Sequence, residues 1–346
     1  MRNKVFRELL LSWHERDNDR TLPWKEEKDP YKIWLSEIIL QQTRAEQGLP
    51  YYLRFIRHYP NVQLLATAAD QEVFKLWEGL GYYSRCRNLL HTARTIVNEF
   101  QGIFPGNYKD LLKLKGIGPY TAAAISSFAF NEAQPVIDGN VYRVLARYHS
   151  DETPYDSSEG KKHFGKLAKE AFDADRPAAY NQAIMDFGAT ICTPKNPKCD
   201  SCPLESNCMA KAKDTVLLLP IKSKRLAVKT RHFHYWLLRE DNRLFIRQRT
   251  EKDIWQSLHE LYLVESENYF YDEQIKKQLG NEAIRPIYTT KQRLTHQLII
   301  SNFYQLTITK QAASTFTKGH WITKEEIKNY AFPKTIVSFL REINYF

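Results

Sequence analysis

Hydrophobic residues in the first 212 positions of the chain recur every three to four residues, which is the spacing of amphipathic helices. Gly, Pro and Asp residues separate these stretches, as they separate helices in globular proteins. The region is therefore expected to be mostly helical. Helices are predicted over residues 5–16, 31–47, 71–78, 85–99, 108–114, 121–130, 141–149, 161–172 and 180–192.

The pattern changes beyond a basic stretch of the chain. Between Asp214 and Glu240 there are six basic residues and no acidic one, so a linker is expected at about residues 213–229. The runs that follow predict strands at residues 232–238, 243–248, 261–264 and 297–309, and helices at residues 272–279 and 333–342. The second part of the chain thus has the pattern of a separate domain with strands and helices.

Composition indicates a class of partner. The 346 residues include 50 Lys and Arg against 40 Asp and Glu, a net charge of +10 that favours a polyanion such as nucleic acid. Charge alone leaves open a basic protein without such a partner. No apolar run approaches the ~18–20 residues of a membrane span, and charged residues interrupt the N-terminal apolar pattern, so no signal peptide is expected. We therefore expect a cytoplasmic protein without membrane contact, associated with the nucleoid if the source is bacterial.

Four of the five cysteines lie within seventeen residues, at Cys192, Cys199, Cys202 and Cys208. Such a group is typical of a metal or cluster site in a reducing compartment and not of a disulfide framework. Four thiolates can hold one [4Fe–4S] cluster or one tetrahedral zinc ion. The spacing lacks the paired Cys-x2-Cys units usual for structural zinc. It resembles the signature of the endonuclease III superfamily of DNA glycosylases, which carries a [4Fe–4S] cluster.

The segment Leu114–Tyr120 has the features of a phosphate-binding turn between two helices. Gly116 and Gly118 let the backbone turn tightly and approach a ligand, and a helix N-terminus follows with free N–H groups for an anion. This is a helix-hairpin-helix pattern, which grips a DNA phosphate without reading the base sequence. We expect Lys115, Gly116 and Gly118 to contact the phosphate. A Gly-x-Gly turn alone is a weak signal, but its place ahead of the cysteine group makes it specific.

Two carboxylates are candidates for acid–base chemistry. Asp138 precedes a predicted helix, and its simplest role is an N-cap. That position also favours the ionised form, which could stabilise a sugar cation. Glu37 lies on a predicted helix beside Ile33 and Trp34, where desolvation would raise its pKa toward that of a usable general acid. An ordinary exposed helix glutamate is the alternative.

Further segments resemble one family within that superfamily, the adenine DNA glycosylases. The resemblance runs from about Trp13 to Cys208 and continues more weakly to the C-terminus. Tyr120 stands where bifunctional members of the superfamily have the lysine that forms a Schiff base, so a monofunctional enzyme is expected. The matching segments are residues 22–24, 34–43, 79–83, 136–141 and 181–189.

The resemblance implies a multidomain fold. Residues 1–212 would form an all-α helix-hairpin-helix glycosylase domain with a [4Fe–4S] cluster loop, made of a helical barrel at about 22–133 and a cluster subdomain of 1–21 and 134–212. After the linker at 213–229, residues 230–346 would form an α+β Nudix-like domain that recognises 8-oxoguanine. The segment Asp253–Leu258 resembles a Gly-Leu-Trp-x-x-Leu segment of this domain, with Asp253 in place of glycine. The metal box of Nudix hydrolases is absent from the sequence.

The family also implies a reaction in base excision repair. A monomeric enzyme would bind double-stranded DNA, flip out an adenine mispaired with 8-oxoguanine or guanine, and hydrolyse its N-glycosidic bond. Glu37 would protonate adenine N7 and later help to deliver water, and Asp138 would stabilise C1′ electrostatically or covalently. Tyr120 and Asn140 would orient these groups. The adenine pocket would be lined by Arg20, Trp24, Lys25 and Gln182. The duplex wedge and the 8-oxoguanine contact would involve Gln42, Thr43, Leu80, Tyr82, Leu294, Thr295 and His296, with Leu294 replacing an aromatic residue of the family.

Four alternatives differ from this interpretation. A pyrimidine glycosylase/lyase of the same superfamily conflicts with Tyr120. A thymine or uracil mismatch glycosylase fits less well, because Glu37 and the C-terminal domain both favour adenine. A Nudix hydrolase would need the missing metal box. A DNA-binding module without activity would leave the pair of Glu37 and Asp138 unexplained.

Overall fold

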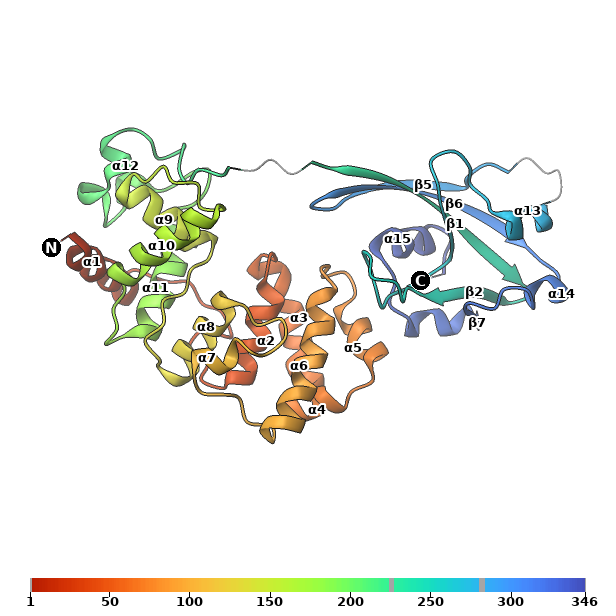
Figure 1. Ribbon diagram of the computed structural model, residues 1–346, viewed down its shortest axis with the longest axis horizontal. Coiled ribbons are helices and arrows are strands. Elements are labelled where there is room, and N and C mark those ends of the chain that lie inside the picture. Colours follow the sequence, from red (N-terminus) through yellow and green to blue (C-terminus); the bar gives the residue numbers. More distant parts are fainter. Residues whose placement is uncertain (1, 224–226, 280–283, 346) are drawn as a thin grey trace. The chain divides into compact units, whose positions relative to one another are not determined.

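The computed structural model describes residues 2–223, 227–279 and 284–345 (Figure 1). The chain forms two compact units, one of Met1–Thr67 with Asn88–Lys224 and one of Ala68–Arg87 with Arg225–Phe346. Residues 224–226 of the expected linker lie outside the described residues. Within the described part of the chain, no helix has both the length and the apolar character that a membrane crossing requires.

The first unit is helical, as its sequence pattern predicts. Its core on the cluster side joins the N-terminal helix to helices far along the chain: the Phe6 and Tyr148 rings lie 4.7 Å apart, and those of Trp13 and Phe187 5.2 Å apart. The helices are α1 (Arg2–Arg16), α2 (Pro30–Leu40), α3 (Ala45–His58), α4 (Val62–Thr67), α6 (Ser84–Phe100, which begins in the second unit), α7 (Tyr108–Leu111), α8 (Pro119–Phe130), α9 (Gly139–His149), α10 (Ser158–Ala171), α11 (Pro177–Thr190) and α12 (Met209–Ala212).

Helix α2 differs from its prediction, because the stretch 31–47 is not one helix. Asp29 caps α2 by accepting a hydrogen bond from the Tyr31 amide, but α2 ends at Leu40. Gln42 then takes a left-handed conformation with φ 56°, and α3 folds back against the end of α2. A Cβ at Gly48 in α3 would lie 2.9 Å from the Leu40 side chain, so glycine permits this return. The break places Gln42 and Thr43 in a turn beside the α2 terminus.

The second unit contains a mixed sheet. Across its described residues seven strands have the order β3-β2-β1-β6-β5, with β4 paired to β1 and β7 to β2. The long central pair of β1 and β6 is parallel, and the other pairs are antiparallel. The strands are β1 (Lys229–Glu240), β2 (Arg243–Gln248), β3 (His259–Glu260), β4 (Tyr262–Glu265), β5 (Tyr288–Arg293), β6 (Gln297–Thr307) and β7 (His320–Thr323); the helices are α5 (Asp70–Trp77), α13 (Glu273–Leu279), α14 (Lys310–Ala313) and α15 (Lys334–Glu342).

Helix α15 covers part of this sheet. The Phe339 ring of α15 stacks on Phe303 of β6 at 4.3 Å and lies 5.9 Å from Tyr288 of β5. Strand β5 was not expected from the sequence. Its polar residues alternate between partly buried and exposed positions at the edge of the sheet, so they lack the apolar run that identifies a buried strand.

Residues 68–87 pack with the C-terminal unit although the sequence pattern joins them to the helical region. The Lys75 ammonium donates to the Tyr330 carbonyl at 2.9 Å. The Glu78 carboxylate accepts from the Phe332 amide at 2.9 Å. The division into a barrel at 22–133 and a cluster subdomain stays a prediction, since the packing of the described residues follows a different boundary at this segment.

Candidate active site and iron–sulfur centre

A cavity of about 410 Å³ lies in the first unit, within the usual size range of ligand sites. Helix α2 contributes Glu37 to its wall, the start of α8 contributes Tyr120, and the start of α9 contributes Asp138 and Asn140. Arg20, Trp24, Thr43 and Gln182 of the predicted site also line it. The structure thus brings all four predicted catalytic side chains to one cavity, and their roles stay predictions.

Glu37 is almost fully buried, with 5% of its surface exposed, because α2 is apolar on most of its faces. Burial raises the pKa of the Glu37 carboxyl to about 7, a hydrogen bond with Tyr120 opposes the rise, and the charge of Asp138 adds to it. A carboxyl with this pKa can both donate and accept a proton near neutral pH.

Asp138 is the N-cap of α9. Its carboxylate accepts from the Val141 amide at 2.8 Å and from the Asn140 side-chain amide at 2.7 Å. Burial raises the pKa of Asp138, whereas these hydrogen bonds and the Arg143 guanidinium act in the opposite direction. The cap role and the proposed electrostatic role therefore use the same carboxylate.

Asn140 is held on two sides. Its amide nitrogen donates to Asp138, and its carbonyl oxygen accepts from Arg143 at 2.8 Å. Helix α11 passes so close that a Cβ at Gly188 would lie 2.6 Å from the Asn140 Cβ. Residue 188 must therefore be glycine for Asn140 to keep this position.

Asp186 organises the predicted adenine pocket, and the sequence interpretation missed it. This fully buried carboxylate accepts from Arg20 at 2.8 Å, Lys25 at 2.9 Å, Asn18 at 2.9 Å and Gln182 at 3.1 Å. Burial favours its neutral form, but the hydrogen bonds outweigh burial and lower the pKa of Asp186. The signal was its four-residue spacing from Gln182, which puts both side chains on one face of a helix.

The structure places Lys25 differently from the other predicted pocket residues. Its ammonium binds Asp186 and donates to the Arg20 carbonyl at 2.6 Å, and Lys25 does not line the cavity. Trp24 does line it, with its ring 5.3 Å from that of Tyr52. Lys25 is thus placed to hold Arg20 in position, and its contact with a bound base stays a prediction.

The predicted phosphate turn joins α7 to α8. Gly116 has φ 81°, and a Cβ there would lie 2.6 Å from the Asn88 Cβ, so glycine is required twice over. Gly118 is the N-cap of α8 and has open space around it. Lys115 is exposed, and its carbonyl accepts from Thr92 at 2.6 Å. The turn therefore presents a lysine and a free helix N-terminus to an anion.

The predicted wedge residues fall into two groups. Gln42 and Thr43 belong to the α2–α3 turn of the first unit, whereas Leu80, Tyr82 and Leu294–His296 belong to the second. Tyr82 is 46% exposed and its hydroxyl lies 3.0 Å from the Thr295 hydroxyl. Leu80 is buried, Leu294 half-buried, and Thr295 and His296 are exposed in the turn between β5 and β6. Contact of these residues with DNA stays a prediction.

The four clustered cysteines, Cys192, Cys199, Cys202 and Cys208, line one small cavity. Arg147 lies against it and donates to the Cys192 sulfur at 3.4 Å and to the Thr193 carbonyl at 2.7 Å. Its charge would compensate that of thiolate ligands, so the residues present fit an iron–sulfur cluster. A [4Fe–4S] cluster bound here would tie four points of the loop together, which stiffens the segment that follows α11.

Comparison with protein families defines the class. Residues 35–170 match the HhH-GPD superfamily of base excision DNA repair proteins, residues 192–208 the iron–sulfur binding domain of endonuclease III, and residues 234–342 the NUDIX domain. A solved thermostable thymine-DNA glycosylase is similar over 61% of this chain and 97% of its own, with a TM-score of 0.57 and 30% identity. A non-covalent endonuclease III–DNA complex has a TM-score of 0.53 over 61% of this chain and 97% of its own, at 20% identity. The fold and site are those of an iron–sulfur DNA glycosylase.

Relatives narrow the class further. An adenine DNA glycosylase of Buchnera aphidicola is 38% identical over 75% of this chain and 73% of its own length. That of Homo sapiens is 42% identical over 60% of this chain and 39% of its own. The chain belongs to the adenine DNA glycosylase family. The predicted fold class, the enzyme class and the [4Fe–4S] cluster are thereby confirmed.

Proposed function

We propose that this protein is a monofunctional glycosylase that removes adenine mispaired with 8-oxoguanine or guanine in duplex DNA. The observation that carries the proposal is that Glu37 and Asp138 lie on the wall of one cavity. Tyr120 lies on the same wall. Enzymes that hydrolyse glycosidic bonds use two carboxyl groups in different environments, one as the acid and the other to stabilise the sugar cation or attack it.

Glu37 is the general acid. With its pKa at about 7, a large share of the carboxyl is protonated at neutral pH and can donate to N7 of a flipped adenine. Protonation makes adenine a better leaving group, and the C1′–N9 bond breaks with the electron pair leaving on the base. The Glu37 carboxylate that remains can then accept a proton from the attacking water.

Asp138 acts on the sugar. Its carboxylate is fixed by the Val141 amide and by Asn140, so it cannot turn away as positive charge develops at C1′. It stabilises the oxocarbenium-like state electrostatically or through a covalent bond, with retention of configuration as the expected outcome. Asn140 holds the Asp138 carboxylate, and Tyr120 holds the Glu37 carboxyl group, each through a hydrogen bond.

The enzyme should leave the DNA backbone intact. Strand cleavage by related enzymes needs an amine to attack C1′. No lysine is among the described residues that line the cavity, and Lys25 is held by Asp186. The product is therefore an abasic site that breaks only when alkali is added.

The proposed division of labour follows the sequence prediction. Residues 1–212 carry out excision, residues 230–346 recognise the base opposite the adenine, and a monomer suffices for both. In the first part, Lys115, Gly116 and Gly118 contact phosphate, which positions the enzyme without selecting sequence.

Single-turnover excision tests the proposal. The substrate is a duplex with one adenine opposite 8-oxoguanine, and each time point is quenched with and without alkali. Cleavage only after alkali supports a monofunctional adenine glycosylase. Cleavage without alkali would overturn the monofunctional assignment. Tight binding without product under either quench would overturn the adenine assignment.

A further inference from the structure

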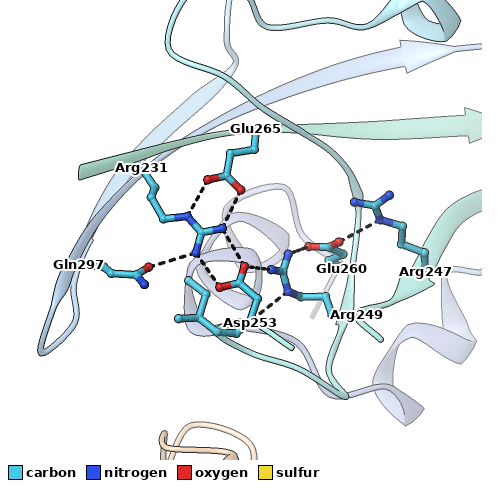
Figure 2. Close-up of polar contacts among 8 residues, drawn as sticks. Arg231, Arg247, Arg249, Asp253, Glu260, Glu265 and Gln297 are labelled. Atoms are coloured by element: carbon cyan, nitrogen blue, oxygen red, sulfur yellow. Dashed lines mark hydrogen bonds and ion pairs between the residues drawn. The ribbon is translucent and has the colours of Figure 1, made fainter. Parts of the chain in front are cut away.

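A network of ion pairs lies in the second unit and reaches Gln297 at the start of β6 (Figure 2). Three arginines alternate with three carboxylates, so the charges balance. Its members are Arg231, Arg247, Arg249, Asp253, Glu260 and Glu265.

Asp253 is the centre of this network. Its carboxylate accepts two hydrogen bonds from Arg231, at 2.8 and 2.7 Å, and one from Arg249 at 2.9 Å. Arg231 forms a second pair of bonds to Glu265, both 2.6 Å long. The Arg231 and Arg249 side chains are only 11% and 9% exposed. Such bidentate pairs fix the geometry of the side chains. Loss of the Asp253 charge would leave Arg231 and Arg249, both largely buried, with one carboxylate partner fewer each.

On one side the network holds the end of the β5–β6 turn. Arg231 donates to the Gln297 side-chain oxygen at 3.2 Å, and Gln297 directly follows Leu294–His296. The Gln297 carbonyl closes the turn by accepting from the Leu294 amide at 2.8 Å. The orientation of Thr295 therefore depends on a residue that Arg231 restrains.

On the other side the network holds the loop that follows β2. Trp255 and Ser257 have φ values of 58° and 76°, a conformation that costs energy for residues other than glycine. Arg249 stabilises the loop by donating to the Ile254 carbonyl at 3.1 Å as well as to Asp253. The loop in turn presents the Gln256 carbonyl to Arg87, at 2.6 Å.

Arg87 connects this loop to Tyr82. The Arg85 amide donates to the Tyr82 carbonyl at 2.8 Å and the Arg87 amide to the Tyr83 carbonyl at 3.1 Å, so Tyr82 and Tyr83 are tied to the first turn of α6, which begins at Ser84. Asp253 thus restrains both partners of the contact between the Tyr82 and Thr295 hydroxyls, one through Arg231 and Gln297 and the other through the 253–258 loop and Arg87.

We propose that Asp253 is a positioning residue for recognition of the base opposite the substrate adenine, acting by holding Thr295 and Tyr82 in register. The inference rests on the proposed function, because it concerns the 8-oxoguanine preference of that same enzyme. Asp253 stands where the resembling segment has glycine, which has no side chain to accept the hydrogen bonds of Arg231 and Arg249.

The Asp253→Asn variant tests the proposal. It keeps the size of the side chain and removes its charge. The ratio of single-turnover excision rates opposite 8-oxoguanine and opposite guanine should fall by about tenfold, the equivalent of one good hydrogen bond. The matched control is Arg243→Gln, which breaks an ion pair to Glu240 of 2.6 Å at the β1–β2 hairpin of the same unit and should leave the ratio unchanged.

A double-mutant cycle separates positioning from general loss of structure. In the Tyr82→Phe background the contact with Thr295 is already broken, so Asp253→Asn should lower the ratio by much less than in the wild type. Equal effects in both backgrounds would overturn the proposal. If Asp253→Asn does not fold, Gln297→Ala provides the test, because it leaves every ion pair of the network intact and should still lower the ratio.

The outcomes distinguish the two proposals. A wild type that does not excise adenine opposite 8-oxoguanine would overturn the proposed function itself. A wild type that prefers 8-oxoguanine, together with an Asp253→Asn variant whose ratio is unchanged, would overturn only the role of Asp253.

Discussion

Replacing Glu37 by glutamine should abolish excision and at the same time stabilise the folded protein above neutral pH. Glutamine keeps the shape of the side chain and can still form a hydrogen bond with Tyr120, but its amide has no acidic proton to transfer to the base. General acid catalysis contributes roughly 10² to 10⁴ in rate, so excision should fall by at least about two orders of magnitude. DNA binding should be retained, because Glu37 lies in the cavity and not in the phosphate-binding turn.

The stability effect has a definite sign. The pKa of Glu37 is about 7 in the folded state and 4.5 in the unfolded chain, so the folded state holds the proton more tightly. As pH rises from 4.5 to 7, Glu37 loses its proton in the unfolded chain but keeps it in the folded protein. Ionisation therefore lowers the free energy of the unfolded chain, and the free energy of unfolding decreases. The difference between the two pKa values corresponds to a loss of roughly 3 kcal/mol in the free energy of unfolding. This loss is complete above pH 7 and absent below pH 4.5. Glutamine does not titrate and avoids this loss.

Two measurements check the prediction. Urea unfolding of wild type and Glu37→Gln at pH 5 and pH 8 should show a stability advantage of the variant that grows with pH. Single-turnover excision by the wild type should decline above pH 7, as the acid loses its proton. Excision by Glu37→Gln at the wild-type rate would refute the acid assignment, and a stability difference independent of pH would refute the pKa argument.

Four further outcomes are expected. Asp186→Asn should lower the excision rate about tenfold or more, because Arg20 and Lys25 lose an ionised partner. The rate of formation of the abasic product measures this effect, and an unchanged rate would contradict it. Leu294→Phe should raise the ratio of excision opposite 8-oxoguanine to that opposite guanine, and an unchanged ratio would contradict the assignment of this turn. Lys115→Ala should weaken DNA binding and reduce the salt slope by about one, as measured by titration at several salt concentrations, with the ratio unaffected. Protein purified without oxygen should show the broad visible absorption of an iron–sulfur cluster, whereas a colourless preparation containing zinc would contradict the cluster.

The parts of the site that depend on local sequence were predictable. The N-cap position of Asp138, the turn at Gly116 and the burial of Glu37 each follow from a few neighbouring residues, and the structure contains all three. The strongly periodic helices and the hairpin of β1 and β2 follow in the same way.

The remaining features depend on contacts between distant segments. The sequence around Asp186 does not reveal its partners Arg20 and Lys25, because they lie more than 150 residues earlier in the chain. Strand β5 is polar and pairs only because β6 offers an edge. The break after Leu40 depends on the return of α3, and the packing of residues 68–87 with the C-terminal unit depends on carbonyl groups such as that of Tyr330. Periodicity carries no information about such pairings.

The close approach of α11 to Asn140 constrains Gly188, which is not among the described residues that line the cavity. A single methyl group at Gly188 would displace Asn140, which holds the Asp138 carboxylate at the cavity wall, while leaving the phosphate turn and the cysteine loop in place. An inherited Gly188→Ala change would then yield a protein that is abundant, coloured and able to bind DNA, yet unable to repair it. Assays of expression or binding would score such an allele as harmless, and only a measurement of turnover would identify it as damaging.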